Sequence, residues 1–171
     1  MIAYHAGDVT RPDLDGRVAI AHVLSDVGAY EAGVAAAIAQ RHPRARTNYK
    51  AWRSQQQGAM QRPFKLGAIQ WVGVGRDLGG AWSDRWVVNM IAQRGLRSAT
   101  NPIPLDLDAL RTCLAVLAAE HRDMVIAMPR IGCGLAGGSW DQVEPIVDAT
   151  LTEVDVHVYD LNPPTSPALV H

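Results

Sequence analysis

The sequence predicts a single domain of the α/β class. Short apolar runs alternate along the chain with longer stretches of helical character, and this alternation favours an α/β sandwich over a helical bundle or an all-β fold. Several of the runs are apolar throughout, as the central strands of a covered sheet must be. A chain of 171 residues is long enough for one domain with a sizeable core, and no internal repeat divides it.

Six apolar runs are the expected strands. The first is the opening MIAYH, and the last is VDVHVYDL near the end of the chain. Between the third and fourth runs, the stretch VGRDLGGAWSDR at 74–85 reads as a hairpin-like turn. Residues 162–171, which contain three prolines, are expected to extend beyond a domain formed by residues 1–161. The strands are expected at 1–5, 18–24, 66–74, 85–93, 124–129 and 154–161.

Helical spacing is clearest in the segment that precedes the fifth run. Leu107, Leu110, Leu114 and Leu117 recur there at steps of three and four residues. Asp106, near the start of the segment, is available as a cap or as a partner for the helix dipole. The helices are expected at 33–41, 45–56, 106–120 and 140–152.

Charge and cysteine usage limit the classes of partner. The formal net charge is -1 and the positive residues are scattered among acidic ones, so no strong binding of nucleic acid or of an anionic membrane is expected. A basic patch assembled only in the folded molecule stays open. Cys113 and Cys133 lack the paired spacing of a disulfide framework or a zinc site. With no leader-like segment and no membrane-spanning apolar run, a cytoplasmic protein is expected.

The segment MPRIGCGLAGGSW at 128–140 lies between an expected strand and an expected helix, where open α/β sheets hold their ligands. Its glycines let the main chain approach a ligand closely, and successive N–H groups ahead of a helix attract a phosphate. The alternative is that the glycines serve only a tight turn. The pattern is neither a GxGxxG nor a Walker loop. The glycines are Gly132, Gly134, Gly137 and Gly138.

Cys133 in this segment is a second candidate for chemistry. A nucleophilic cysteine needs a base that generates the thiolate and an electropositive surrounding. No histidine neighbours Cys133 in the sequence, although His22 in the second expected strand is available to approach it. Small thiols in glycine loops are more often packing residues, so a packing role is the alternative.

Two further segments follow expected strands. GDVT places Asp8 at a strand end, where the carboxylate either accepts hydrogen bonds from an amine or forms an Asx-type turn. In IAHVLSDVGAYEAGVAAAI, a strand runs into a loop with Gly28 and Gly33 and then into an alanine-rich helix. Two such glycine junctions in one sheet are able to hold the two ends of a diphosphate. His22 inside the strand is either a catalytic group or a hydrogen-bonded core histidine.

Together these segments resemble the macrodomain family, whose members bind ADP-ribose. The resemblance spans nearly the whole chain, from GDVT through AHVLSDVGAYEAGVA to MPRIGCGLAGGSWDQV and the final VHVYDL. PRIGCGLAGGSW is most similar to the branch of the terminal ADP-ribose glutamate glycohydrolases and the ADP-ribose-1″-phosphate phosphatases, and VVNMIAQRG resembles bacterial and phage members of that branch. The resemblance implies a three-layer α/β/α fold with a mixed central sheet, and neither a cofactor nor a metal.

The same resemblance implies a role for each loop. Asp8 is expected to accept a hydrogen bond from the adenine amino group, with Val9 beside it. Gly33 and Val34 are expected to meet the distal ribose and the pyrophosphate, and Ser25 stands where many macrodomains place an asparagine against that ribose. The third segment is expected to wrap the pyrophosphate with its N–H groups, through Ile131, Gly132, Cys133, Gly134, Leu135, Ala136 and Gly137.

Two departures remove the lysine-based mechanism of the glycohydrolase subgroup. That subgroup has a lysine after the central strand that attacks the anomeric carbon, whereas MIAQRG here offers Gln93, which forms no Schiff base. The subgroup also has an acidic residue directly after GCGL, where this chain has Ala136. The groups left for acid–base catalysis near the distal ribose are His22, Ser25, Asp26 and Glu31, with Cys133 as an outside candidate.

Two functions remain open from the sequence. The one we expect is hydrolysis at the distal ribose of an ADP-ribose derivative, which needs a titratable group within hydrogen-bond reach of the anomeric position. The alternative is a binding module that senses or sequesters ADP-ribose or a related NAD-derived nucleotide without turnover. The expected partner is therefore ADP-ribose or an ADP-ribosylated substrate. A different nucleotide-binding α/β protein is a third interpretation, which the lack of a Walker lysine disfavours.

Overall fold

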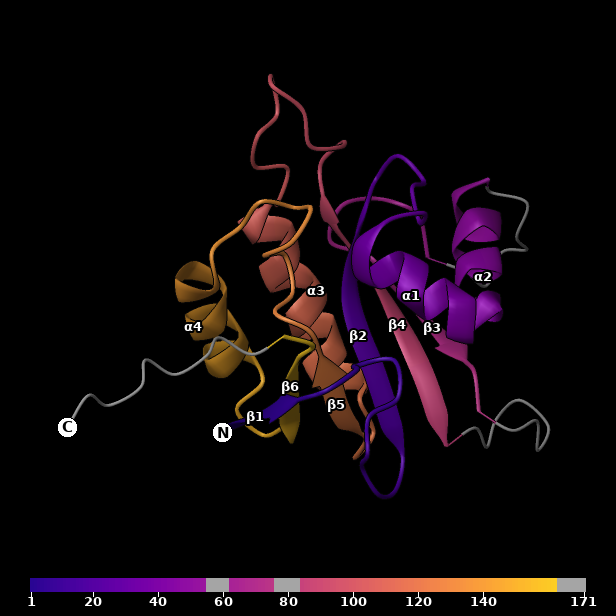
Figure 1. Ribbon diagram of the computed structural model, residues 1–171, viewed down its shortest axis with the longest axis vertical. Helices are drawn as coiled ribbons and strands as arrows, with labels where there is room; N and C mark the ends of the chain where they lie inside the picture. Colours follow the sequence, from indigo (N-terminus) through magenta and orange to yellow (C-terminus); the bar gives the residue numbers. More distant parts are fainter. Residues whose placement is uncertain (55–61, 76–83, 163–171) are drawn as a thin grey trace.

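The computed structural model describes residues 1–54, 62–75 and 84–162. Within these ranges a six-stranded sheet, in the order β1-β6-β5-β2-β4-β3, lies between two pairs of helices (Figure 1). The strands are β1 (Ile2–Ala6), β2 (Val18–Ser25), β3 (Ile69–Gly73), β4 (Arg85–Gln93), β5 (Val125–Met128) and β6 (Val156–Asp160). The helices are α1 (Gly33–Arg41), α2 (Pro43–Arg53), α3 (Leu107–Glu120) and α4 (Trp140–Thr150).

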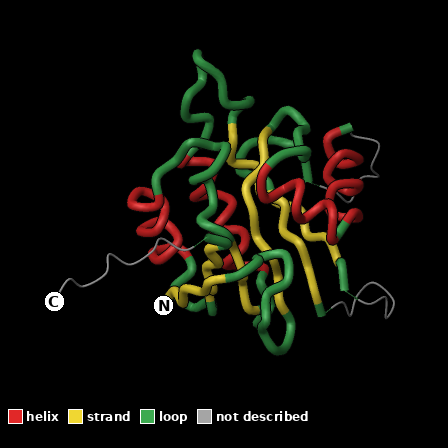
Figure 2. The backbone as a smooth tube through the Cα atoms, in the orientation of Figure 1, coloured by secondary structure: helices red, strands yellow, loops and turns green. Residues whose placement is uncertain are grey.

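This architecture confirms the predicted three-layer α/β/α fold with a mixed sheet. β1, β6, β5, β2 and β4 run parallel, and β3 at one edge pairs antiparallel with β4. Because the carboxyl ends of parallel strands share one edge of a sheet, the connections that follow β2, β4 and β5 gather at that edge, whereas the connection that follows β1 lies lower and loops down to the start of β2 (Figure 2). The predicted site residues lie on the connections that follow β1, β2 and β5 and at the end of β2, except for His22, which lies inside β2.

The central strand β2 is buried from both sides because its side chains alternate between two cores. Ala19 and Ala21 belong to the core beneath α3 and α4, whereas Val18 and Ile20 belong to the core beneath α1 and α2. This double burial explains why the run is apolar except for His22. A strand packed on both faces has little freedom to shift, so it holds the loop that follows it in a fixed position.

All ten predicted elements are present, and the largest differences in starting point, of two or three residues, are at α2, β3 and β6. α2 begins at Pro43, two residues early, because proline fits the first helical position, where an N–H donor is not needed. The third strand begins at Ile69 rather than at residue 66, because Gly67 has a φ of +88° and turns the chain just before it.

Three predictions fall wholly or partly outside the described residues. They concern the end of the second helix at 55–56, the hairpin-like turn at 74–85 and the extension at 162–171, so the domain boundary at residue 161 stays a prediction. β3 and β4, which flank the turn, pair antiparallel, with Gly73 opposite Trp86. Across the part of the chain that the structure describes, every helix is too short or too polar to span a membrane.

Candidate functional site

The connections after β2 and β5 face each other at the edge where the parallel strands end. A Cβ built at Gly33, the first residue of α1, would lie 3.3 Å from Cδ1 of Leu135, so the two connections are in contact. Val34 and Leu135 are large apolar side chains that nevertheless stay exposed there. The fold therefore brings the two predicted glycine junctions together. We call residues 26–34 and 131–137 the facing loops.

The second of the facing loops presents free backbone N–H groups. The N–H groups of Cys133 and Gly137 donate to carbonyls of the same loop, at N···O distances of 3.2 and 3.0 Å. The N–H groups of Gly134, Leu135 and Ala136 donate to no acceptor within the described ranges. Successive free N–H groups just before a helix N-terminus attract an anion, and a phosphate fits this arrangement.

The glycines of this loop divide into two kinds. A Cβ at Gly137 would lie 2.6 Å from the carbonyl oxygen of Pro102, and Cβ atoms at Gly132 and Gly138 would lie 2.8 and 2.5 Å from the side chain of Leu105. These three glycines therefore serve the tight packing of the turn. A Cβ at Gly134 would meet nothing within 4 Å, so the space beside Gly134 is open to a ligand.

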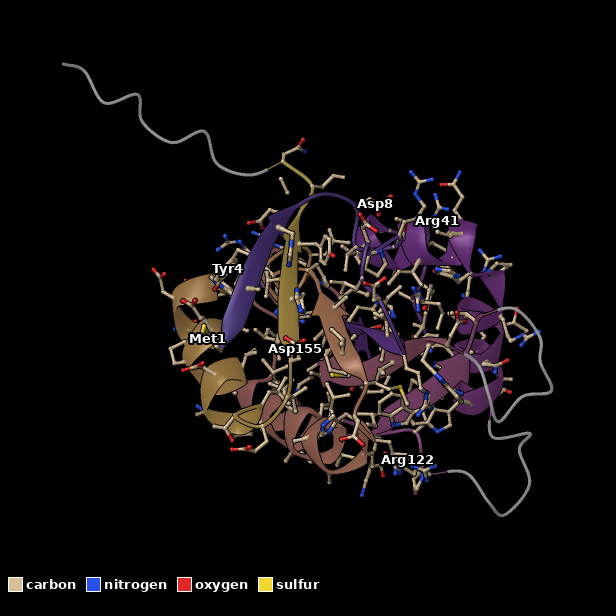
Figure 3. The ribbon with its side chains drawn as sticks, turned by 90° about the horizontal axis from the view of Figure 1, so that it is seen from below. Met1, Tyr4, Asp8, Arg41, Arg122 and Asp155 are labelled. Atoms are coloured by element: carbon tan, nitrogen blue, oxygen red, sulfur yellow. The ribbon has the colours of Figure 1, made fainter. Side chains whose placement is uncertain are left out.

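Asp8 lies exposed after β1 and forms the Asx-type turn that the sequence left open. Its Oδ1 atom accepts hydrogen bonds from the N–H and the hydroxyl of Thr10, at 2.9 and 2.7 Å. The hydroxyl hydrogen bond, and then the N–H bond and nearby arginines, lower the pKa of Asp8. Figure 3 shows Asp8 and Arg41 at the same edge of the molecule, where Nε of Arg41 also donates to the Thr10 hydroxyl. The Oδ2 atom of Asp8 has no partner among the described residues and is free to accept from a ligand.

His22 is buried in the core beneath α1 and α2 rather than placed at the surface. The side chain is 1% exposed, and its Nε2 atom lies 2.7 Å from Oδ1 of Asn89 and 3.1 Å from the hydroxyl of Tyr30. Burial lowers the pKa of His22 from 6.5 to about 4, so the ring is neutral at neutral pH. The ring is therefore a core histidine that is hydrogen-bonded through Nε2, whereas its buried Nδ1 atom has no partner among the described residues. The predicted catalytic role of His22 stays a prediction.

Ser25 and Asp26 differ in their access to the facing loops. The Ser25 hydroxyl is buried and has no hydrogen-bond partner within the described ranges, although the Ser25 carbonyl accepts from the hydroxyl of Tyr49 at 2.7 Å. Asp26 is half-buried, and its Oδ1 atom accepts from the N–H of Gly95 at 2.8 Å. The Oδ2 atom of Asp26 has no such partner in the described part of the chain. Of the predicted catalytic residues, Asp26 therefore offers the most accessible base.

Cys133 lies half-buried in the second facing loop. Burial raises the pKa of its thiol to about 11, although the charge of Arg130 opposes this shift. The Sγ atom lies 3.4 Å from the carbonyl oxygen of Ile131. A thiol that stays protonated at neutral pH is a poor nucleophile, so the surroundings of Cys133 suit packing.

Glu31 and Gln93 are both held by other groups. Glu31 pairs with Lys50, its other carboxylate oxygen accepts from the N–H of Tyr30 at 2.8 Å, and these contacts lower its pKa. Gln93 is 8% exposed and donates to the carbonyl of Gly95 at 3.0 Å. Neither side chain is free to act as a base or a nucleophile on a bound sugar.

A cluster that sequence reasoning missed joins the two ends of the second facing loop. Arg130 binds Asp160 through two hydrogen bonds of 2.7 and 2.8 Å. The guanidinium carbon lies 5.4 Å from the ring centre of Tyr4 and 5.5 Å from that of Trp140, whose indole N–H donates to the Tyr4 hydroxyl. We call Tyr4, Arg130, Trp140 and Asp160 the clamp. The sequence places the positive Arg130 just after β5 and the negative Asp160 at the end of β6. This pair of charges predicts a contact only once β5 and β6 are known to be neighbours in the sheet.

An open cavity of about 500 Å³ lies beside the N-terminus of α3, and Leu105 in its lining also contacts the second facing loop, where the Leu105 N–H donates to the carbonyl of Ala136 at 3.1 Å. Arg94 at its wall pairs with Asp106 at 3.1 Å, and Arg111 pairs with Asp108 at 3.0 Å. The guanidinium groups of this cavity are therefore neutralised by neighbouring carboxylates. Its lining includes no residue of the predicted site.

Comparisons with known proteins give matches among solved structures alone. No family model matches the sequence, and no curated protein does. A macrodomain protein from Streptomyces coelicolor is 35% identical over 94% of this chain and 99% of its own, with a TM-score of 0.75. A protein of unknown function from Bacteroides thetaiotaomicron is 33% identical over 94% and 98% of the two chains, with a TM-score of 0.80. DarTG of Thermosipho africanus, solved in complex with ADP-ribose, is 16% identical over 82% and 37%, with a TM-score of 0.65.

Proposed function

Because the chain belongs to the macrodomain family, we propose that it binds the ADP-ribose group, with the pyrophosphate held by the facing loops. The observation that carries this proposal is the row of free N–H groups at Gly134, Leu135 and Ala136, next to a glycine whose missing side chain leaves open space. Main-chain N–H donors suit a diphosphate because their dipoles and hydrogen bonds stabilise its negative charge without requiring an ordered lysine. The ADP-ribose bound to DarTG of Thermosipho africanus supports the choice of ligand.

Asp8 supplies the second half of the proposed binding mode. One of its oxygens is occupied by Thr10, which fixes the orientation of the carboxylate, and the other is available to an amino group. An adenine amino group held there would orient the nucleotide relative to the facing loops. Val9, which is buried in the core beneath α1 and α2, anchors this turn to the body of the protein.

Calorimetry with ADP-ribose tests the proposal. Gly134→Val fills the open space beside the free N–H groups without touching the rest of the protein, so we expect affinity to fall more than about tenfold, or 1.4 kcal/mol. Cys133→Ser is the matched control in the same loop, because it changes the adjacent side chain and preserves the backbone, and it should retain most of the affinity. Failure of the wild-type protein to bind ADP-ribose would overturn the proposal, as would equal affinities for the two variants.

A second candidate function is hydrolysis at the distal ribose, and the position of Asp26 favours it. A carboxylate held by one oxygen on the Gly95 N–H keeps its other oxygen free to take a proton from a water molecule. The activated water would form a bond to the anomeric carbon while the bond to the leaving oxygen breaks, and that oxygen takes up a proton. One positioned base of this kind contributes on the order of 10²–10⁴-fold.

The test of turnover compares two variants on ADP-ribose-1″-phosphate and on ADP-ribosylated protein. Asp26→Asn keeps the hydrogen bond from Gly95 and removes the base, so it should abolish product formation and leave ADP-ribose binding intact. His22→Gln is the comparison, and full activity of this variant would exclude the predicted catalytic role of His22. A wild-type protein that binds but forms no product identifies a binding module, and a fully active Asp26→Asn protein excludes Asp26 as the base.

A further inference from the structure

Half of the positive charges of the chain lie in one segment that has no acidic residue. Residues 32–76 contain eight of the sixteen Lys and Arg residues and no Asp or Glu. The near-zero net charge conceals this separation, so the expectation of evenly scattered charges does not hold along the chain. The consequence of the separation depends on where the fold places these residues.

The fold displays five of these cations on the outer side of α1 and α2. We call Arg41, Arg44, Arg46, Lys50 and Arg53 the basic face, and all five are exposed. Lys50 pairs with Glu31, whereas the four arginines have no carboxylate within ion-pair distance among the described residues. One of the two helices on the opposite side of the sheet, α4, is acidic instead. It contains Asp141, Glu144 and Asp148 and no Lys or Arg.

The helix dipole accounts for only two of these charges, because Lys50 and Arg53 lie in the last turn of α2, where a cation is favourable. Arg44 lies in the first turn of α2, where the helix dipole disfavours a positive charge, and no acidic residue compensates it there. Arg46, Lys50 and Arg53 follow at steps of four and three residues, so they form one stripe on the surface of the helix. Arginines without a carboxylate partner among the described residues, grouped on one short helix, point to an external anion.

The composition of the face distinguishes between classes of partner. Protein interfaces have a core enriched in apolar and aromatic residues, whereas nucleic acid is bound through its phosphates alone when no sequence is read. The large exposed apolar residues of the described chain include none between residues 35 and 54. Guanidinium groups, which form two parallel hydrogen bonds with a phosphate, make up four of the five cations.

We propose that the basic face binds the phosphate backbone of nucleic acid without sequence preference. The stripe borders the first facing loop, because Lys50 pairs with Glu31, and because a Cβ at Gly28 would lie 2.5 Å from Cδ of Arg53. A bound strand therefore passes beside the candidate site without entering it. This proposal is independent of ADP-ribose binding and goes beyond it.

Fluorescence anisotropy with a labelled oligothymidylate and with a duplex of mixed sequence tests the proposal. We expect both to bind, and about four phosphate contacts predict that affinity falls about 100-fold between 50 and 200 mM salt. Arg44→Gln combined with Arg46→Gln should weaken binding at least about tenfold at low salt and reduce the salt slope for the duplex by about two. Arg111→Gln combined with Arg122→Gln is the matched control, with the same change in net charge away from the basic face, and Figure 3 shows Arg122 far from Arg41.

Three results would overturn the proposal. One is no binding at 50 mM salt, and another is equal weakening by both pairs of substitutions. The third is loss of nucleic-acid binding in Gly134→Val, which would place the anion on the facing loops. Sedimentation of the protein alone tests whether the basic face binds a second copy of this chain instead. A salt-sensitive dimer that the Arg44 and Arg46 substitutions disrupt, in the absence of nucleic-acid binding, would assign the face to that second copy. Calorimetry of that variant with ADP-ribose should give wild-type affinity, which separates this proposal from the proposed function.

Discussion

His22 is a buried titratable side chain, and its burial makes the stability of the protein depend on pH. The pKa of the ring is about 4 in the folded protein and about 6.5 when the chain is unfolded. Above pH 6.5 the ring is neutral in both states. Between pH 6.5 and 4 the unfolded chain binds a proton that the folded protein does not, so the free energy of unfolding decreases as the pH falls. The decrease amounts to about 3 kcal/mol over this window.

Urea unfolding of the wild-type protein and of His22→Gln between pH 7.5 and 4.5 measures this contribution. The carboxylates and the other histidines titrate in both proteins, so the difference between the two curves isolates His22. We expect the difference to be constant above pH 7 and to shift in favour of the variant below pH 6. Parallel curves over the whole range would mean that the ring accepts its proton in the folded state.

Gly137 and Gly134 allow the two roles of glycine in one loop to be measured separately. Gly137 has a φ of +73° and no room for a Cβ, so Gly137→Ala should lower the free energy of unfolding by about 1–3 kcal/mol. Gly134→Ala meets open space and should change it by less than about 0.5 kcal/mol. Chemical denaturation of both variants provides the comparison, and similar losses at the two positions would contradict the division of the glycines.

The clamp holds both ends of the second facing loop in place through several contacts. It joins Arg130 at the start of the second facing loop to Trp140 at the start of α4, and it fixes both to the end of β6 through Asp160. Arg130 holds the pKa of Asp160 below its ordinary value, so this contribution to stability is present at neutral pH and is lost as the pH falls through that lowered pKa.

Arg130→Lys keeps the positive charge and loses the paired hydrogen bonds and the planar group that stacks on the rings. Because the side chain is partly exposed, we expect the loop to lose about 0.5–1 kcal/mol of local stability, which lowers ADP-ribose affinity by at most about two- to fivefold. Hydrogen exchange should become faster in residues 131–138, with little change in the core strands. An affinity loss with unchanged exchange would show instead that Arg130 contacts the ligand.

The elements of this fold are readable from the sequence because each has a strong local signal. The leucine spacing of α3 and the apolar run of β2 depend only on neighbouring residues, so the positions of both elements follow without knowledge of the fold. The clamp depends on Arg130 and Asp160 meeting across adjacent strands, which no local pattern reveals. The burial of His22 likewise depends on Tyr30 and Asn89, which come from other segments of the chain.

At the scale of the whole molecule, the formal net charge of -1 does not reveal that many of the cations are grouped on the basic face. The sequence pI is about 6.6, so a protein with evenly distributed charge would not be retained by a cation exchanger at pH 7.5. We expect retention at low ionic strength through the basic face, and earlier elution of the variant with Arg44→Gln and Arg46→Gln. Elution of both proteins in the void volume would show that the cations are neutralised locally.

The pairing of β1 with β6 joins the two strands that lie farthest apart in the sequence. Ile2 lies opposite Val156, and β6 is the strand on which β1 pairs. At a synthesis rate of roughly 5–20 residues per second, the ribosome needs on the order of 10–30 seconds to make the intervening segment. During this time the newly made N-terminal strand has no partner, and its unsatisfied hydrogen-bonding groups are open to chaperones or to aggregation.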